Sequence, residues 1–352
     1  MWPKVSIIWL NYNSRRILDI VLRSLESIAG LDYPEDRYEL IVVDNGSLDG
    51  SLGEIASFLE RSTIRRKVIK LERNLGFTGG NNIGFMARDR ESKYVLLLNN
   101  DAVLYSDGLK ALIEYAEQYE HIGGLNGVVL KYGGNIIDSA EVFLSEMLKI
   151  DVPGEGMRYP WILKRPYYVT YADGCCALYR VDHLLRCCGG RIFVNEGFMY
   201  FDDYLLGLML WNHGFKLACI PKIVAEHARG STIGEGSPLQ HYFGARGRIA
   251  LSLISNSRFK KLILLQSIRG LYKCVSLRPS MCTRAVIDGL KLGKLVMHKY
   301  GILIDLYKAP IIELNSLWAL GHLIFTRSTG RRILRKIYED WFIKNLKKLT
   351  VD

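Results

Sequence analysis

The sequence lacks the motifs that identify several common classes of protein. Its seven cysteines include no C-x-x-C pair and no paired spacing with histidines, so neither a zinc site nor a disulfide framework is predicted. We expect reduced thiols, as in the cytosol. No N-terminal signal peptide is predicted, because the apolar run at 4–10 is short. The glycine fingerprint of a dinucleotide site and the P-loop are also absent.

Long apolar runs are missing as well. A membrane-spanning helix needs about 20 mostly apolar residues. The nearest candidate, 309–326, contains Glu313, Asn315 and His322, so a span is the less favoured interpretation. The composition is otherwise that of an ordinary folded protein, with 49% hydrophobic and 24% charged residues. A chain of 352 residues can form one large domain with an appendage, or two domains.

Positive charge is concentrated at the end of the chain. The formal net charge is +11. Residues 240–352 contain 21 Lys and Arg against 6 Asp and Glu, which gives +15, and the remaining 26 and 30 give −4 for residues 1–239. This asymmetry separates two functional parts at 239/240 and predicts an anionic partner for the second part.

Strand and helix patterns alternate over the first 130 residues. Apolar runs predict strands at 5–10, 38–44, 67–72 and 94–98. Apolar periodicity predicts helices near 15–28, 52–61, 81–90 and 107–120. Four repeats with short loops favour a parallel, doubly wound α/β sheet.

The pattern is less regular after residue 130. Residues 131–166 show no clear period and are predicted to be a loop-rich insertion, and 167–180 is predicted to be one strand bent at Gly174. The expected elements after it are a helix at 202–213 and short strands at 216–220 and 223–225.

Polar residues gather directly after the predicted strands, at 11–13, 44–46, 73–74 and 99–101. Ligands bind outside the carboxyl ends of the strands in an open parallel sheet, so these clusters favour one shared site over four unrelated turns. Asp101 suits Mg²⁺ or Mn²⁺, which take one or two protein carboxylates plus phosphate oxygens. Taken alone, Asp202 and Asp203 fit a helix start, and a lone His227 fits a structural role.

Six segments, in this order and at these intervals, resemble the inverting nucleotide-sugar-dependent transferases of glycosyltransferase family 2, and most of all a rhamnosyltransferase-like branch. They cover about residues 3–250 and read SIIWLNYNS, LIVVDNGSLDGS, RNLGFTGGNNIGF, YVLLLNND, FMYFDDYLLGLML and EHARGST. The resemblance implies an α/β GT-A fold, which is Rossmann-like, for residues 1–239. The basic and mostly helical part, 240–352, would extend it.

The resemblance also implies roles for matching residues. Asp44 corresponds to the acid that hydrogen-bonds the nucleobase, and Asp203 to the catalytic base. Asp101 and His227 correspond to ligands of Mg²⁺ or Mn²⁺. The other positions implied in donor binding are Asn11, Arg73, Asn74, Gly79, Gly80, Asn82 and Asn100. The chain departs from the family pattern at Asn99, Leu205 and Met209, where acids and an arginine are usual.

The implied reaction moves a sugar from a nucleotide diphosphate sugar to an acceptor hydroxyl of a glycan or lipid-linked precursor, with inversion. The N-terminus of its helix is expected to keep Asp203 ionised, as a general base requires. One alternative is a catalytically inactive nucleotide-sugar-binding or membrane scaffold protein. Another is a sugar nucleotidyltransferase, which would need a glycine-rich loop where this chain has NYNSRR.

Aliphatic and cationic residues alternate at helical spacing in residues 251–352. The clearest segments are 260–269, 331–337 and 341–348, and we expect Trp341 and Phe342 to face the acyl chains of a bilayer. These helices are predicted to lie on the cytoplasmic face of an anionic membrane without crossing it. A solvated appendage or a dimer face is the alternative, and no recognition motif supports nucleic acid.

Overall fold

Four parallel strands form the first half of the central sheet. The computed structural model describes residues 1–229, 237–272, 279–324 and 327–351. The sequence prediction of these strands is confirmed, and they pair in the order β4-β1-β2-β3. Their bounds are β1 Val5–Asn11, β2 Tyr38–Asp44, β3 Arg66–Lys70 and β4 Tyr94–Asn99. Every residue of β2 is buried, as expected for a continuous apolar strand covered on both faces.

Helices cover this half of the sheet, and their bounds are α1 Leu18–Ala29, α2 Ser51–Glu60, α3 Gly76–Ala87 and α4 Gly108–Gln118. The third helix begins at Gly76 and not near residue 81 as expected. A Cβ atom on Gly80 would lie 2.4 Å from Cδ1 of Leu10, and one on Gly84 would lie 2.5 Å from Cγ2 of Ile8. Glycine at these positions therefore lets α3 pack closely against β1.

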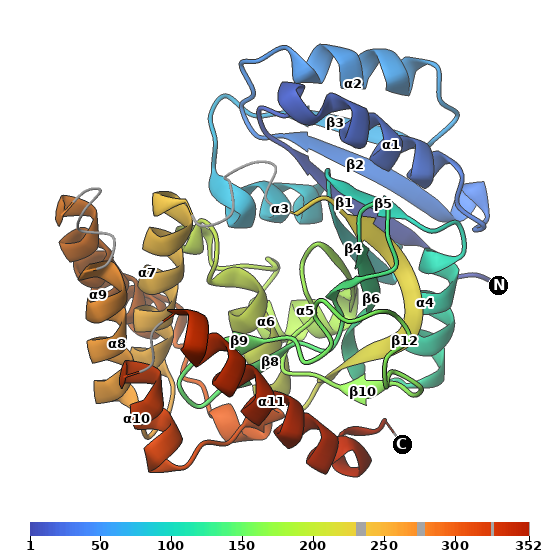
Figure 1. Cartoon of the computed structure of the whole chain (residues 1–352). Coiled ribbons are helices and arrows are strands. Elements are labelled where there is room, and N and C mark those ends of the chain that lie inside the picture. Colours follow the sequence, from blue (N-terminus) through green and yellow to red (C-terminus); the bar gives the residue numbers. More distant parts are fainter. Residues whose placement is uncertain (230–236, 273–278, 325–326, 352) are drawn as a thin grey trace.

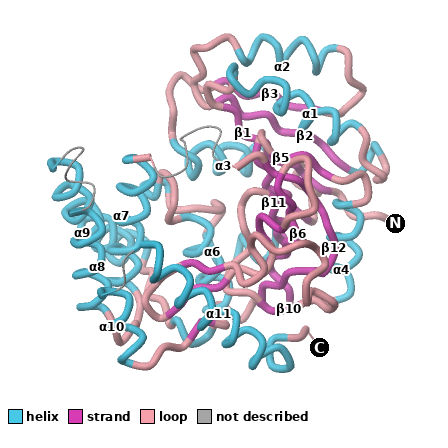
Figure 2. The backbone as a smooth tube through the Cα atoms, viewed as in Figure 1, coloured by secondary structure: helices cyan, strands magenta, loops and turns pink. Residues whose placement is uncertain are grey.

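The second half of the sheet is mixed, which corrects the expectation of a wholly parallel sheet. Its strands are β5 Ala102–Leu104, β6 Ile122–Lys131, β7 Ile137–Ser139, β10 Tyr167–Tyr168, β11 Cys176–Arg180 and β12 Lys216–His227. Strand β11 lies between β4 and β6 and is antiparallel to both, whereas β12 is parallel to β6. The α/β fold class itself is confirmed, and Figure 2 shows the strands gathered in one curved sheet.

Two strand predictions in this half are wrong in detail. The segment 167–180 forms two strands because β10 pairs with β12 while β11 pairs with β4 and β6. The segments 216–220 and 223–225 belong to one strand, β12, whose register shifts between Ile220 and Ile223. Pro221 lies at this shift and cannot donate a ladder hydrogen bond, which explains the interruption in the sequence pattern.

The insertion at 131–166 belongs to the core as much as to the surface. Residues 137–148 are all buried. A small second sheet joins the insertion to the C-terminal part, with β13 Ile311–Ile312 parallel to β8 Phe143–Ser145 and β9 Ile150–Asp151 antiparallel to β8. Partners this distant in sequence explain why the segment shows no local periodicity.

Helices make up most of the remaining chain, and their bounds are α5 Val181–Cys188, α6 Asp202–Asn212, α7 Pro238–Ile254, α8 Lys260–Tyr272, α9 Pro279–Tyr300, α10 Ser316–Ile324 and α11 Arg327–Leu349. In Figure 1, α7, α8, α9 and α10 form a group along one side of the molecule, and α11 crosses in front of β8 and β9. Among the residues that the structure describes, no helix is both long and apolar enough to cross a membrane.

Candidate active site

The ends of β1, β2 and β4 bring three predicted donor-binding residues into contact. Nδ2 of Asn11 donates to Oδ1 of Asp44 at 2.8 Å, and Nδ2 of Asn100 donates to Oδ1 of Asn11 at 3.3 Å. Ser14 also donates to Oδ1 of Asn11, at 2.5 Å. All four side chains are buried, so this network fixes the carboxylate of Asp44 at the edge of the sheet.

The loop after β3 lies against the end of β2. Nδ2 of Asn45 donates to Oδ1 of Asn74 at 3.0 Å, and the backbone N–H of Leu75 donates to Oδ1 of Asn45 at 2.9 Å. Gly46 has a φ of +79°, and a Cβ there would lie 2.7 Å from the carbonyl carbon of Arg73. The side chain of Arg73 is exposed beside this contact and forms no ion pair with a described residue. It is therefore free to reach an anionic ligand.

Three of the predicted donor-binding residues have internal contacts instead. Oδ1 of Asn82 accepts hydrogen bonds from the backbone N–H groups of Ile192 and Phe193, both at 2.9 Å, and its Nδ2 donates to the carbonyl of Phe193 at 2.8 Å. Gly79 and Gly80 lie within α3, where added Cβ atoms would meet the side chains of Leu75 and Leu10. These contacts position α3 and the loop at 192–195, and donor binding by the three residues stays a prediction.

The predicted metal ligands lie next to each other. Nε2 of His227, at the end of β12, is 3.1 Å from Oδ1 of Asp101, which follows β4. Its Nδ1 is 3.2 Å from Oδ2 of Asp138, and Nε of Arg229 donates to the same oxygen at 3.0 Å. Burial lowers the pKa of His227, but its hydrogen bonds to the carboxylates of Asp101 and Asp138 outweigh burial and raise the pKa to about 9.

This arrangement fits a divalent cation. Oδ1 of Asp101 and Nε2 of His227 are close enough to contact the same ion. Oδ2 of Asp138 contacts the other ring nitrogen, as is usual for metal-bound histidine. Within the described ranges, no group of three or more His, Cys, Asp and Glu side chains could hold an ion by itself. A cation at Asp101 and His227 would need further ligands, such as the phosphate oxygens that Mg²⁺ commonly takes.

Asp203 lies in the first turn of α6, close to the loop at 173–175. Its Oδ2 accepts the backbone N–H of Gly174 at 3.2 Å, while its buried Oδ1 has no hydrogen-bond partner among the described residues. Burial raises the pKa of Asp203 well above the usual value, and the charges of Asp202 and Asp173 raise it further. The helix N-terminus is expected to favour the ionised form of this carboxyl, but burial opposes that effect and outweighs it, so the pKa is raised.

Contacts between neighbouring residues place Asp203 near Asp101 and His227. The backbone N–H of Asn99, two residues before Asp101, donates to the carbonyl of Cys175, next to Gly174. Asp173 accepts Oγ of Ser139 at 2.6 Å, and its Oδ2 is 4.0 Å from Nη2 of Arg229. One edge of the sheet therefore holds the donor cluster, the carboxylate–imidazole pair and the candidate base.

The sequence analysis missed Asp138, Asp173, Asn45 and Arg229. Asp138 occurs in the segment 131–166, which has no clear period, and Asp173 occurs beside the predicted bend of the strand at 167–180, so nothing local distinguishes them from surface acids. Arg229 belongs to the segment EHARGST, whose last three residues lie outside the described ranges. The buried charge of Asp138, which is 1% exposed, is evident only once the chain is folded.

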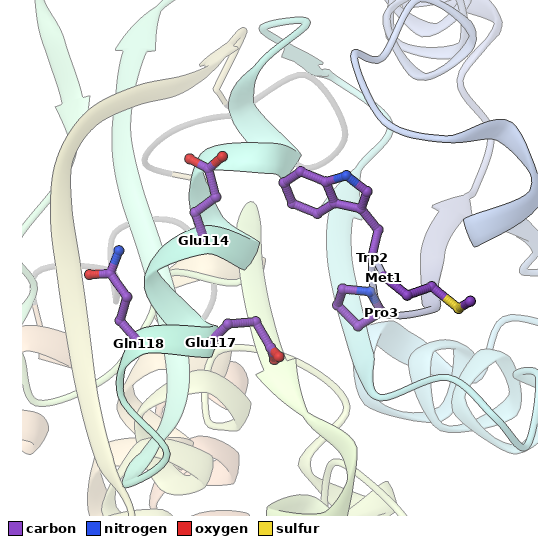
Figure 3. A pocket seen from close by; sticks show the side chains of 6 residues that line it. All are labelled: Met1, Trp2, Pro3, Glu114, Glu117 and Gln118. Carbon is purple, nitrogen blue, oxygen red and sulfur yellow. The ribbon is translucent and has the colours of Figure 1, made fainter.

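A separate hollow lies at the opposite edge of the sheet. Met1, Trp2 and Pro3 line it on one side, and Glu114, Glu117 and Gln118 of α4 line it on the other (Figure 3). Met1–Pro3 precede β1, so this hollow is at the amino end of the parallel strands. It contains none of the predicted site residues.

The mixed sheet and its covering helices form the GT-A fold of glycosyltransferases. The chain belongs to glycosyltransferase family 2, since the sequence model of Glycosyl transferase family 2 matches residues 6–186, just over half of its length. The match gives the family and does not extend to the rhamnosyltransferase-like branch.

Individual relatives agree with this class. The poly(ribitol-phosphate) beta-N-acetylglucosaminyltransferase TarS of Staphylococcus aureus is 29% identical over 117 residues, which are 33% of this chain and 19% of that protein. The matched segment thus spans about a fifth of this curated relative.

Two solved structures share the fold. One is the mannosyltransferase PcManGT of Pyrobaculum calidifontis in complex with GDP-Man and Mn²⁺, at 16% identity, 98% and 88% coverage of the two chains and a TM-score of 0.53. The other is residues 1–349 of S. aureus TarS in complex with UDP-GlcNAc, at 16% identity, 98% and 92% coverage and a TM-score of 0.54. At these identities the likeness concerns the fold alone.

Proposed function

We propose that this protein transfers a sugar from a nucleotide diphosphate sugar to an acceptor hydroxyl, with inversion, by a metal-assisted single displacement. The observation that carries the proposal is the placement of Asp44, the Asp101–His227 pair and Asp203 at one edge of the sheet. Two neighbours of the same fold are complexes with GDP-Man and Mn²⁺ and with UDP-GlcNAc, which supports this choice of donor and cofactor.

The donor is bound at the ends of β1, β2 and β3. Asp44, fixed by Asn11, accepts hydrogen bonds from the nucleobase, and the exposed Arg73 pairs with phosphate. Asn74 and Asn100 line the same edge.

Asp101 and His227 hold Mg²⁺ or Mn²⁺, and Asp138 orients His227 through Nδ1. A cation held by these residues would supply Lewis-acid stabilisation of the leaving diphosphate.

Asp203 accepts the proton of the attacking hydroxyl. Its Oδ1 has no hydrogen-bond partner in the described part of the chain, so it can accept one from the acceptor. Because one displacement inverts the anomeric centre, a single base suffices and no enzyme nucleophile is required. Leu205 and Met209 are buried in the core, so apolar packing braces α6 where the family commonly has charged residues.

The acceptor is a hydroxyl of a glycan or lipid-linked precursor, and two sugars are candidates for the donor. The sequence resemblance to the rhamnosyltransferase-like branch favours a deoxyhexose, whereas the name of the relative TarS favours N-acetylglucosamine. An inactive sugar-nucleotide-binding protein is the second candidate function, because Asn99 replaces an acid and the pKa of Asp203 is raised well above its usual value.

The experiment that tests the proposal is a thermal-shift screen of nucleotide sugars, each with and without Mn²⁺, followed by turnover of the donor that binds. A ligand at 100 times its Kd stabilises the fold by about 2.7 kcal/mol. Stabilisation that needs Mn²⁺, followed by sugar transfer, is the expected result. Binding without turnover on any glycan or lipid-linked acceptor would favour the inactive binding protein, and no stabilisation by any sugar nucleotide would contradict both.

A further inference from the structure

The outward face of α9 is a cationic stripe. Arg284, Ile287, Lys291, Lys294 and His298 are exposed and follow one another at spacings of three or four residues, which places them on one side of the helix. The opposite side is apolar and faces α7. Lys291 and Lys294 form no ion pair with any residue that the structure describes, so their charges are available to a partner.

Exposed apolar side chains occupy the neighbouring helices. On α10, Leu317 and Leu320 are 78% and 43% exposed, and Trp318 is exposed between them. On α8, Leu265 and Ile268 are 54% and 39% exposed. Helix α8 contacts both α9 and α10, and Figure 1 shows the three helices along one side of the molecule. Each helix also turns buried residues inward, such as Ile263 and Ala319, so this exposure is not a sign of an unpacked segment.

Helix α11 does not provide the membrane face that the sequence suggested. Phe342 is fully buried, with ring centroids 5.7 Å from Phe143 and 6.0 Å from Trp161. Trp341 is 5.3 Å from Phe143. The side chains of residues 331 and 332 are outside the described part of the chain. The aromatic side of α11 therefore faces the insertion and is unavailable to lipid.

We propose that the outward sides of α8, α9 and α10 form a docking face for an anionic lipid membrane. The exposed cations of α9 would attract lipid headgroups, and the exposed Leu and Trp side chains of α10 could enter the acyl boundary, since both helices contact α8. A soluble polyanion would use the cations and leave the apolar side chains in water. A second copy of the chain would bring the same positive charge to the contact, which opposes self-association. This inference goes beyond the proposed reaction and does not rest on it.

The test is flotation of the full chain with vesicles of phosphatidylcholine, or of equal parts phosphatidylcholine and phosphatidylglycerol. Lys291→Glu with Lys294→Glu should weaken binding to the anionic vesicles by at least about tenfold. The matched control is Arg61→Glu with Arg90→Glu, two exposed cations far from α9 in sequence, and it should leave binding close to wild type. Binding should also be lost in 1 M salt, where the Debye length is about 3 Å.

A second pair of variants tests the apolar contribution. Leu317→Ser with Leu320→Ser should weaken binding, whereas Met86→Ser with Leu185→Ser removes two exposed apolar side chains on α3 and α5 and should not. Unchanged thermal midpoints show that the variants fold. Equal loss in the face and control variants, or unchanged flotation in the face variants, would overturn the proposal. It would also be overturned if light scattering shows a dimer that the Leu317/Leu320 variant dissociates, because the face would then be a self-association surface.

Discussion

Asp202 and Asp203 are adjacent in sequence, yet their carboxylates have different surroundings. Oδ1 of Asp202 accepts the backbone N–H of Phe201 at 2.7 Å, whereas Asp203 receives one long hydrogen bond from Gly174. A carboxyl held in this way favours its neutral form, and a raised pKa makes its ionised form the stronger proton acceptor. The residue therefore combines poor solvation with the properties of a general base.

Asp203→Asn should abolish most turnover and keep the fold. Loss of a general base typically costs about 10²–10⁴ in rate. Folding raises the pKa of this carboxyl, so its contribution to stability is lost as the pH rises, and at neutral pH the amide should be at least as stable. Steady-state kinetics, donor binding and thermal melting check this. Near-wild-type turnover with donor binding intact would rule out Asp203 as the base.

The acid limb of kcat/KM should lie above the ordinary carboxyl range and should depend on Asp202. Activity rises with pH as the base ionises, and burial and the neighbouring charges raise the apparent pKa of this coupled pair. Asp202→Asn removes a like charge, so the limb should move to lower pH. Asp173→Asn should move it the same way, because its charge also raises the pKa of Asp203. An upward shift in either variant would contradict this origin.

Asp138→Asn should weaken Mn²⁺ binding by about 10–100-fold, because a lost carboxylate partner leaves His227 poorly oriented. Electron paramagnetic resonance of free Mn²⁺ measures this without turnover. Glu155→Gln is the matched control, since the carboxylate of Glu155 lies 3.7 Å from Nη1 of Arg229 and, among the described residues, forms no hydrogen bond with His227. The same loss in both variants would show that Asp138 acts through Arg229 and not through the imidazole.

At this scale, motif position correctly predicted that Asp44, Asp101 and His227 lie at strand ends, and their roles in binding stay predictions. Each is the last residue of a strand or lies within two residues of one, and parallel strand ends meet by geometry. The family resemblance implies donor binding for Asn82, Gly79 and Gly80. Their partners are a distant loop and two leucines, which no local pattern reveals.

At the scale of elements, α3 supports the loop that leads to the candidate base. Thr78 donates through Oγ1 to the carbonyl of Asn195 at 2.9 Å and accepts the N–H of Phe198 at 3.1 Å. Phe198 and Tyr200 have φ values of +62° and +58°, a conformation that L-residues rarely adopt. Such backbone persists only where the surroundings enforce it, so α3 helps to determine where α6 begins.

Asn82→Ala should destabilise the fold by a few kcal/mol. It leaves the N–H groups of Ile192 and Phe193 without their acceptor, and a buried unsatisfied group costs about 1–3 kcal/mol. Asn81→Ala is the control, because Nδ2 of Asn81 bonds only to the carbonyl of Phe77 in its own helix. Urea unfolding of both variants measures the difference. Lower donor affinity at unchanged stability would instead support a direct role of Asn82 in donor binding.

Long apolar strands could be predicted, and short strands with distant partners could not. Strands β1, β2 and β4 are mostly apolar and buried, so composition alone marks them, whereas the edge strand β3 reads RKVIK and is half exposed. Strand β13 has two residues and pairs with β8, more than 160 residues earlier. The lack of local periodicity therefore predicts a loop-rich insertion at 131–166, although its residues 137–148 are buried.

At the scale of the whole molecule, residues 1–239 and 240–352 share one hydrophobic core. That core contains Phe143 and Leu210 from the first part and Ile254, Leu306 and Phe342 from the second. The division of charge at 239/240 is therefore accompanied by continuous apolar packing across the boundary. A chain cut there would expose a large buried surface.

Glu146 makes the same connection through polar contacts. It is fully buried in the insertion, and its carboxylate accepts Nη2 of Arg258, the N–H of Leu314 and the hydroxyl of Tyr307, each at 2.7 Å. All three donors belong to the C-terminal part. Without them an apolar environment would hold a carboxylate with no counter-charge, which costs several kcal/mol.

A protein ending at residue 239 should therefore fail to fold. Native domains are stable by only about 5–15 kcal/mol, so loss of the three donors to Glu146 together with about a third of this core exceeds what the remainder can tolerate. Solubility, circular dichroism and thermal melting of this truncation check the expectation, and the full chain should unfold in one cooperative transition. Glu146→Gln in the full chain keeps the core, so it should lower the melting midpoint without abolishing the transition. A monodisperse 1–239 protein with cooperative unfolding would show that the catalytic part is autonomous and that the basic helices only cover it.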